Sequence, residues 1–249
     1  MANRFRPRGL LLAGLAVICG AAGASGLQVA PVGLEFQPSD PAQGLWLTNT
    51  GEETLHAQVR VFHWTQGNGK DELTPTHDLV ASPPMLALAP GARQMIRVIR
   101  LGNRNTDAAE DAYRLLVDEL PQTTPQQQIG VHYVLRYSVP VFVEPANKPD
   151  PGSVAASLRW SLVDGYDGPA LQVYNAGSVH AQISDVSMSV STGAATVVNA
   201  GLLGYVLPGM TMRWPLKMAS EELRPGIRLK AAINGNPVEQ TLALGGLPR

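Results

Sequence analysis

The 249-residue sequence is poor in cysteine, charge and long apolar segments. Its single cysteine, Cys19, lies near the N-terminus, so disulfide bonds cannot staple the fold. Charged residues make up 16% of the chain, and 19 basic against 20 acidic side chains give no basic field for nucleic acid or anionic lipid. The apolar run from Leu10 to Ile18 is too short to span a bilayer, and no other segment qualifies. The composition therefore disfavours disulfide scaffolds, nucleic-acid-binding proteins and membrane-inserted proteins.

Motifs for catalysis and metal binding are also missing. The five histidines show no HxH or HExxH spacing, and the GxSxG elbow and the P-loop are absent. His56 and His180 occupy equivalent positions of an internal repeat, which favours structural roles over metal ligation. Without a nucleophile, a base or a ligand set, no residues can be assigned to an enzymatic step. We therefore expect a protein that is not an enzyme and holds no metal or other cofactor.

Residues 1–26 have the features of a secretory signal peptide. Basic residues between positions 4 and 8 precede the apolar run, and Ala22-Gly23-Ala24 offers a small-x-small cleavage pattern. A lipoprotein signal centred on Cys19 fits poorly, because Ile18 stands where that signal needs a small residue. We predict cleavage after Ala24 and export. The remaining chain has no cysteine, and its 16 basic and 20 acidic residues give a net charge of −4.

The rest of the sequence consists of short alternating apolar runs separated by glycine and proline. About seven such runs lie between residues 27 and 145, the strand count of an immunoglobulin-like sandwich, and no comparable segment has a 3.6-residue period. A Pro-rich stretch at 146–152 has the composition of a stiff linker, and a second set of runs occupies 153–249. The sequence predicts an all-β protein with two tandem immunoglobulin-like β-sandwich domains, 27–145 and 153–249.

The second set of runs repeats a pattern found in the first. The equivalent segments are Leu45-x-Leu47-x-Asn49-x-Gly51 and Leu171-x-Val173-x-Asn175-x-Gly177, then Leu55-His-Ala-Gln-Val59 and Val179-His-Ala-Gln-Ile183, and finally Pro90-Gly91 and Pro208-Gly209. The spacings of 126, 124 and 118 residues indicate that one module was duplicated. We interpret the Asn-x-Gly in each copy as a turn that needs residues tolerating positive φ.

One predicted strand, residues 129–144, is unusually long. Pro140 near its end lacks the N–H that a central strand would use in its ladder, which favours an edge position. A long apolar edge promotes aggregation unless it pairs with a partner. The strand is therefore the leading candidate for a binding element. Its apolar face, read in steps of two, consists of Ile129, Val131, Tyr133, Leu135, Tyr137, Val139 and Val141.

Several motifs along the chain combine into one family pattern. They are the signal peptide, Leu27-Gln-Val-Ala-Pro31, Ser82-Pro83-Pro84, Leu88-x-Pro90-Gly91-x-x-Gln94-x-Ile96-Arg97, Asp118-Glu119-Leu120-Pro121, Val141-Phe142-Val143-Glu144-Pro145 and the Pro-rich joint. With these motifs the chain resembles the periplasmic pilus-assembly chaperones. The resemblance implies a periplasmic protein that binds pilus or fimbrial subunits in 1:1 complexes and delivers them to an outer-membrane usher. Neither nucleic acid nor membrane insertion is expected.

The resemblance also implies a mechanism for the long strand. Such a chaperone lends its seventh strand to a subunit that lacks its last one, so that free backbone groups and alternate apolar side chains fill the gap. The subunit-binding residues would then be Val131, Tyr133, Leu135 and Tyr137. The structural alternative is that this face covers the domain's own core. The functional alternative is a tandem immunoglobulin-like extracytoplasmic structural, adhesion or peptide-binding module.

The chain departs from the better-known branch of the family and is more similar to the archaic branch. That better-known branch grips the subunit's terminal carboxylate with an Arg and a Lys, where this sequence has Gly33 and Pro140. Its interdomain charge cluster has an Arg where Glu144 stands and an Asp near Gly235, whereas Glu110 matches its acidic partner. The interdomain contact must therefore be built differently.

A terminal carboxylate still needs a cation with a fork of donors if it is to be fixed. The resemblance leaves Arg97 and Arg100 as candidate anchors, because apolar neighbours in their strand would hold their stems and leave the charged heads free. The two side chains point to opposite faces, so we expect at most one of them to reach the carboxylate. The alternative is that both are solvated surface charges.

Overall fold

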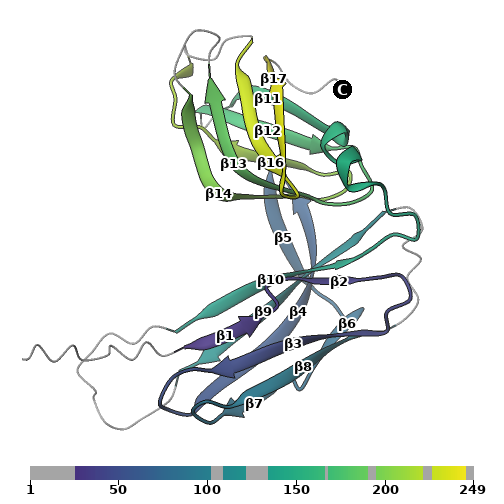
Figure 1. Ribbon diagram of the computed structural model, residues 1–249, viewed down its shortest axis with the longest axis vertical. Coiled ribbons are helices and arrows are strands. Elements are labelled where there is room, and N and C mark those ends of the chain that lie inside the picture. The colour runs from purple at the N-terminus through teal and green to yellow at the C-terminus, as the bar shows by residue number, and fades with distance from the viewer. Residues whose placement is uncertain are drawn as a thin grey trace, which may run out of the picture.

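The computed structural model describes residues 26–101, 109–121, 134–165, 168–189, 195–220 and 226–244. These residues form two β-sandwiches stacked end to end (Figure 1). The predicted fold class, all-β with two tandem immunoglobulin-like sandwiches, is confirmed. Two short 3-10 turns, Pro151–Ser153 and Ala155–Ser157, precede the second sandwich. The predicted signal peptide lies outside the described residues, apart from Gly26.

The first sandwich consists of a sheet with strand order β1-β3-β8-β6 facing a sheet with strand order β2-β10-β9-β4-β5, in which β7 also pairs with β4. The strands are β1 (Leu27–Ala30), β2 (Leu34–Phe36), β3 (Ala42–Asn49), β4 (Leu55–Gly67), β5 (Lys70–Pro75), β6 (Leu79–Ser82), β7 (Met85–Leu88), β8 (Arg93–Arg100), β9 (Asp111–Leu120) and β10 (Arg136–Val143).

The second sandwich pairs a sheet of order β15-β12-β11-β18 with one of order β14-β13-β16-β17. Its strands are β11 (Leu158–Gly165), β12 (Gly168–Asn175), β13 (Ala181–Ser189), β14 (Thr196–Val206), β15 (Thr211–Pro215), β16 (Arg228–Ile233), β17 (Asn236–Thr241) and β18 (Ala243–Leu244).

Each sandwich has its own apolar core, built by the alternation that the sequence shows. In the first core, Leu45 of β3 lies opposite Ile96 of β8, and both side chains are fully buried. In the second core, Leu171 and Val173 of β12 are equally buried. Burying a side chain of this size stabilises the fold by about 1.5–3 kcal/mol relative to leaving it exposed. Each core lies within its own sandwich, so the contact between the two sandwiches is made by other residues.

A buried asparagine closes one end of the first sandwich. Asn49 donates from Nδ2 to the carbonyl oxygens of Glu53 (2.7 Å) and Leu88 (2.9 Å), and its Oδ1 accepts from the backbone N–H of Gly51 (2.9 Å). The side chain thus forms hydrogen bonds with three backbone groups, two carbonyl oxygens and one N–H.

Asn175 makes the same contacts in the second sandwich. Its Nδ2 donates to the carbonyl oxygens of Val179 (2.8 Å) and Val206 (2.9 Å), and its Oδ1 accepts from the N–H of Gly177 (2.9 Å). The matching hydrogen bonds support the duplication read from the sequence. The expected reason for the motif is wrong, because the positive-φ positions of the described residues include neither Asn-x-Gly segment. The asparagines are needed for buried hydrogen bonds rather than for backbone conformation.

The two sandwiches meet where the β4–β5 hairpin reaches the second sandwich (Figure 1). Gln66 near the tip of this hairpin donates from Nε2 to the carbonyl oxygen of Tyr205 (2.9 Å) and accepts at Oε1 from the N–H of Leu207 (2.9 Å). Its amide therefore pairs with the end of β14 as the backbone of a neighbouring strand would. A buried apolar cluster of Trp64, Ala112, Phe142 and Leu207 lies beside it.

A histidine and a glutamate complete this joint. The ring of His180 stacks on the ring of Phe142, with centroids 3.6 Å apart, and its Nδ1 lies 2.8 Å from Oε1 of Glu110. Glu110 is the acidic residue that the resemblance placed at the interface, and it meets a histidine here rather than an arginine. Glu144 forms an ion pair with Lys148 instead (2.5 Å). The joint thus combines aromatic packing with amide and His–Glu hydrogen bonds.

Replacing either buried asparagine with alanine should destabilise the protein. Because Asn49→Ala or Asn175→Ala leaves buried backbone acceptors without donors, we expect a loss of roughly 2–4 kcal/mol in the free energy of unfolding for each. Urea unfolding followed by tryptophan fluorescence measures this loss. The exposed Asn236→Ala serves as the control, and we expect it to change stability by less than about 0.5 kcal/mol. Equal stabilities for all three variants would show that these bonds do not stabilise the sandwiches.

Candidate functional site

Strand β10 is covered on both sides over only part of its length. It pairs with β9 from Arg136 to Val143, but β2 pairs with it only at Val141–Val143. The side of Arg136–Pro140 that faces away from β9 has no strand partner among the described residues, and we call it the open edge. The edge position predicted for this strand thus holds for Arg136–Pro140 and not for its last three residues. Of the predicted strand, residues 129–133 lie outside the described part.

Backbone hydrogen bonding shows which groups the open edge presents. The N–H of Glu119 donates to the carbonyl of Leu135 (3.0 Å), so odd-numbered residues of β10 bond to β9. In an antiparallel ladder the alternate residues point the other way, which turns the N–H and C=O groups of Arg136 and Ser138 toward the open edge. Pro140 belongs to the same set. Its missing N–H therefore costs no bond to β9, which explains how a proline fits in this strand.

The apolar face of β10 is buried in the protein's own core toward the end of the strand and is only half-buried near its start. Val139, Val141 and Val143 are buried in the first core, so the alternative that this face covers the domain's own core holds for them. Tyr137 is half-buried, packs against that core, and donates its hydroxyl proton to the carbonyl of Leu27 in β1. Leu135 is also half-buried. The structure therefore brings together two of the four predicted subunit-binding residues, whereas Val131 and Tyr133 lie outside the described part.

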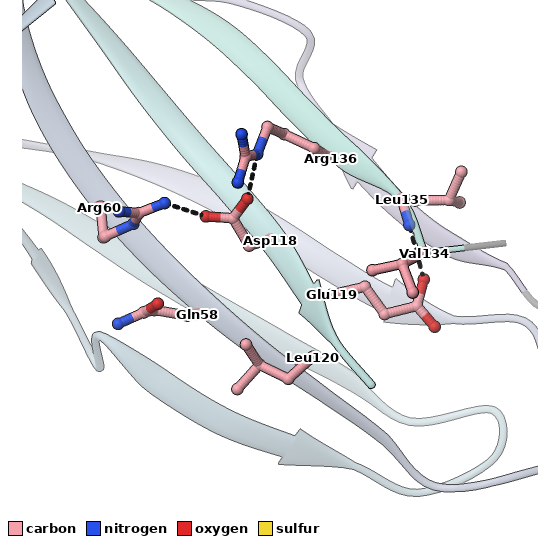
Figure 2. Close-up of a pocket in the computed structure, with 8 residues that line it drawn as sticks. All are labelled: Gln58, Arg60, Asp118, Glu119, Leu120, Val134, Leu135 and Arg136. Carbon is pink, nitrogen blue, oxygen red and sulfur yellow. Dashed lines mark hydrogen bonds and ion pairs between the residues drawn. The ribbon is translucent and has the colours of Figure 1, made fainter. Parts of the chain in front are cut away.

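The outer face of the sheet beside the open edge carries a charged group that sequence reasoning missed. Figure 2 shows Arg60 of β4 and Arg136 of β10 pointing toward Asp118 of β9. Nη2 of Arg60 lies 2.7 Å from Oδ2 of Asp118, and Nε of Arg136 donates to Oδ1. The three side chains line a depression of about 380 Å³ that also includes Glu119 and the exposed Val134. These residues are far apart in the sequence, and only the strand register brings them together.

The two arginines set the protonation of Asp118. Burial alone would raise the pKa of its carboxyl, but hydrogen bonds from Arg60 and Arg136 and the charges of both guanidinium groups outweigh it. The pKa of Asp118 is therefore lowered from its usual value near 3.8. The carboxylate stays ionised across the physiological pH range and holds both guanidinium groups in place.

The candidate anchors Arg97 and Arg100 lie on the other sheet. Arg97 is exposed on β8 opposite Gly44, and its head has no partner among the described residues. Arg100 is half-buried at the end of the same strand and donates from Nη1 to the carbonyl of Pro38 (3.0 Å). The structure does not bring either arginine together with Leu135 and Tyr137. Their anchoring role stays a prediction.

A second depression follows the outer side of β1 and ends at Tyr137. Trp46 and Arg93 line it, with the guanidinium carbon of Arg93 4.0 Å from the ring centroid of Trp46. This depression lies next to a sheet edge of the first sandwich, because β1 is a terminal strand of its sheet. The surface around Tyr137 is thus hollowed on the β1 side as well.

The described residues offer neither a metal site nor a membrane-spanning helix. In the ranges that the structure describes, no group of three or more His, Cys, Asp or Glu side chains is arranged to hold a metal ion. None of the helices in those ranges has the length and apolar character needed to cross a membrane. The chemistry that the site offers is hydrogen bonding along a strand edge, apolar contact and ion pairing.

Comparison with known proteins places these features in one family. Residues 26–149 match the sequence model of the PapD N-terminal domain, described as a pili and flagellar-assembly chaperone domain. The chaperone protein CssC of Escherichia coli is 22% identical over 132 residues, which cover 49% of this chain and 54% of CssC. The alignment thus spans about half the length of that curated relative.

Solved structures share the fold over most of the chain. The CsuC–CsuE chaperone–tip adhesion subunit pre-assembly complex from archaic chaperone-usher Csu pili of Acinetobacter baumannii contains a chain with a TM-score of 0.68 and 23% identity, covering 89% of this chain and 100% of that one. The complex of SafA pilin with the SafB chaperone of Salmonella enterica gives 0.62 and 16%, with coverages of 89% and 99%. The CupB2 chaperone of Pseudomonas aeruginosa gives 0.60 and 18%, with coverages of 88% and 100%.

The pKa shift of Asp118 leads to a testable pH dependence. A carboxyl whose pKa is lower in the folded state stabilises the fold above its unfolded pKa, and the stabilisation disappears as pH falls through the lowered value. We therefore expect Asp118→Asn to be less stable than the wild type at pH 7, and the difference to shrink below about pH 4. Urea unfolding at pH 7, 5, 4 and 3 measures the difference.

The matched control for this series is Asp150→Asn. Asp150 is exposed, and its side chain makes no ion pair within the described ranges. We expect its stability curve to follow the wild type at every pH. If the gap between Asp118→Asn and the wild type stayed constant down to pH 3, the two arginines would not be holding Asp118 ionised.

Proposed function

This chain belongs to the family of pilus-assembly chaperones, and on that premise we propose that it holds pilus subunits by lending them the open edge of β10. The observation that carries the proposal is the incomplete cover of this strand by β2. Over Arg136–Pro140, backbone donors and acceptors face away from β9, and the adjoining apolar face leaves the protein's own core. A subunit strand would form hydrogen bonds with these backbone groups and cover the apolar face.

The apolar contact supplies the larger part of the binding energy. In the sequence, Val131, Tyr133, Leu135 and Tyr137 alternate in step with Val139 and Val141, which are buried in the first core. Burying four such side chains contributes on the order of 6–10 kcal/mol before the costs of association are subtracted. That amount is enough to hold a subunit that would otherwise expose its core and aggregate.

The extent of the lent strand is limited at its C-terminal end. Pro140 has no N–H to donate, and from Val141 onward the ladder position is already taken by β2. A subunit strand can therefore pair with Arg136 and Ser138 and with the residues before them, but it cannot continue past Pro140. The joint between the two sandwiches lies just beyond this point, because Phe142 is buried in it.

The setting and partners of this activity form part of the proposal. Pilus-assembly chaperones are periplasmic, and the N-terminal sequence has the features of a cleaved signal peptide, so we place the protein in the periplasm. It would bind one subunit per chaperone and pass it to an outer-membrane usher. The role is one of binding, with no catalytic step.

A tandem immunoglobulin-like structural or adhesion module is the competing function. Such a protein would polymerise or join a fibre, whereas a chaperone is soluble alone and forms heterodimers with one subunit. The open edge itself is compatible with both. Size-exclusion chromatography of the purified protein, with and without a co-expressed pilin subunit, separates the two functions.

Placing charges on the apolar face should abolish subunit binding. We expect the Tyr133→Asp, Leu135→Asp double variant to fold normally but to recover at most about a tenth of the pilin subunit that the wild type recovers, because two charges would be buried without partners. Periplasmic co-expression with candidate pilin subunits followed by pull-down measures recovery.

The control for this experiment carries two aspartates elsewhere. Val197 and Leu202 are exposed apolar residues of β14 in the second sandwich, so Val197→Asp, Leu202→Asp adds the same charge away from β10. We expect this control to bind like the wild type. If the β10 double variant also binds like the wild type, the contact lies elsewhere and the proposed strand lending is wrong.

The anchoring role of Arg97 or Arg100 can be tested separately. We expect either Arg97→Ala or Arg100→Ala to lower subunit recovery by about tenfold, because a carboxylate loses its charge-assisted hydrogen bonds. Extending the subunit by Gly-Ser at its C-terminus moves its terminal carboxylate. We expect the wild-type chaperone to recover this extended subunit as poorly as the alanine variant recovers the original subunit. Full recovery by both alanine variants would leave the two arginines as surface charges.

A further inference from the structure

The outer face of β10 beside the open edge presents two partly used guanidinium groups, which we call the arginine pair. Arg60 uses Nη2 and Arg136 uses Nε to bind Asp118. Within the described residues their remaining N–H groups have no hydrogen-bond or ion-pair partner, and the side chains are 42% and 64% exposed. Each guanidinium therefore keeps donors that can bind a further carboxylate, with Asp118 holding the pair in position.

Arg60, Arg136 and Asp118 together carry one positive charge, because two guanidinium groups share one carboxylate. With the negative charge of Glu119, the charged side chains that line the depression sum to zero. Glu119 also lines the depression, but its Oε2 accepts from the N–H of Leu135 (3.3 Å), and in the described structure it forms no ion pair with the arginine pair. A partner that covered the arginine pair without an acidic group would desolvate the guanidinium groups and give them no carboxylate in return.

The position of Arg136 relative to the open edge defines what the arginine pair would meet. Its backbone groups point to the open edge, and its side chain projects on the outer face with Arg60 and Asp118 (Figure 2). A strand added at this edge places the residue opposite Arg136 on that same face, with Cβ atoms about 4.5–5.5 Å apart. An aspartate or glutamate side chain at this position reaches the free donors of Arg136, whereas Arg60 extends from β4, on the far side of β9, and adds its charge beside Asp118.

We propose that Arg136, held by Asp118 and with the charge of Arg60 beside it, binds an aspartate or glutamate side chain of the subunit strand that pairs with β10, at the position opposite Arg136. The proposal rests on the strand lending proposed above. It gives the outer face a role distinct from that of Leu135 and Tyr137 on the inner face. The occupant is a subunit strand because Arg136 lies on the part of β10 whose edge β2 leaves open.

The consequence of this contact is control of register. A strand with alternating apolar residues can slip by two positions and still present its apolar side chains to the same face. A two-residue slip would move the acidic side chain to a diagonal position, about 7–8 Å away between Cα atoms. The arginine pair therefore favours one register over its neighbours. Subunits with an acidic residue at that position are selected over subunits without one.

A competition assay tests the proposal, because subunits are unstable without a chaperone. A complex of tagged wild-type chaperone with a pilin subunit is mixed with an untagged variant, and the partition of the subunit is measured. For Arg60→Gln, Arg136→Gln we expect partition to favour the wild type by about tenfold at 50 mM NaCl and by less than about threefold at 500 mM, because salt screens exposed ion pairs.

The control for charge loss is Arg228→Gln in the second sandwich. Arg228 is 60% exposed and lies 3.9 Å from Glu239, so its environment is similar to that of Arg136 while its location is remote. We expect this variant to compete as well as the wild type. Asp118 should be left unchanged in these experiments, because its removal would disturb both arginines.

A zero-length cross-link identifies the carboxylate. Arg136→Lys keeps the charge and supplies an amine, which carbodiimide couples only to a carboxylate in direct contact. We expect mass spectrometry to find an amide bond between this amine and an aspartate or glutamate side chain in the subunit strand. Changing that subunit residue to its amide should lower partition as the double arginine variant does, and combining both changes should add little.

Each other outcome overturns part of the argument. Equal partition for the double arginine variant and the wild type would overturn the arginine-pair proposal while leaving strand lending intact. A link to the subunit's terminal carboxylate, or to Asp118 alone, would overturn the assignment to a subunit side chain. A wild-type protein that forms no complex with any pilin subunit would overturn both the arginine-pair proposal and the proposed function.

Discussion

The open edge of β10 exists because β2 is short. This strand covers three residues of β10 and then stops, which leaves the preceding part of β10 paired on one side only. Backbone N–H and C=O groups that have neither a strand partner nor water destabilise the fold. Beside an apolar face, such groups favour pairing with another strand. The constraint is geometric: the chain leaves β1 for the opposite sheet at Pro31, so only a short segment remains to form β2.

One strand thereby carries four contacts. The inner face of β10 packs in the first core at Val139 and Val141 and is available to a partner near Leu135. Its outer face contributes Phe142 to the joint between the sandwiches and Arg136 to the arginine pair. The joint and the open edge are thus adjacent on a rigid element. The hydrogen bonds of Gln66 and the stacking of His180 on Phe142 fix the second sandwich with respect to β10.

The sequence was sufficient for the fold class and for the edge position of Arg136–Pro140, because alternation, turn residues, an internal repeat and a proline within a strand are local signals. It also indicated that Glu110 would lie at the joint. It could not show where the pairing of β10 changes from one side to two, because that depends on the length of β2 and the register of the sheet. The same limit hid the arginine pair, since Arg60 and Asp118 become neighbours only through the pairing of β4 with β9. The sequence showed the repeated Asn-x-Gly motif, but the expected reason for it, a turn with positive φ, was wrong. Asparagine followed by glycine is equally compatible with a turn and with a buried side chain that makes hydrogen bonds.

An open edge must also be safe while no subunit is bound. Edge strands are protected by charge and proline, and both are present here: Arg136 stands at the start of β10, and Pro140 stands directly before the residues that β2 covers. The hydroxyl of Tyr137 adds a bond to the carbonyl of Leu27 and so links the edge strands of the two sheets. Pro140 stops an added strand from pairing further along β10. By the proposals above, a subunit strand would gain apolar contact on one face and an ion pair on the other. The edge would therefore favour a complementary subunit strand over a strand that lacks these contacts.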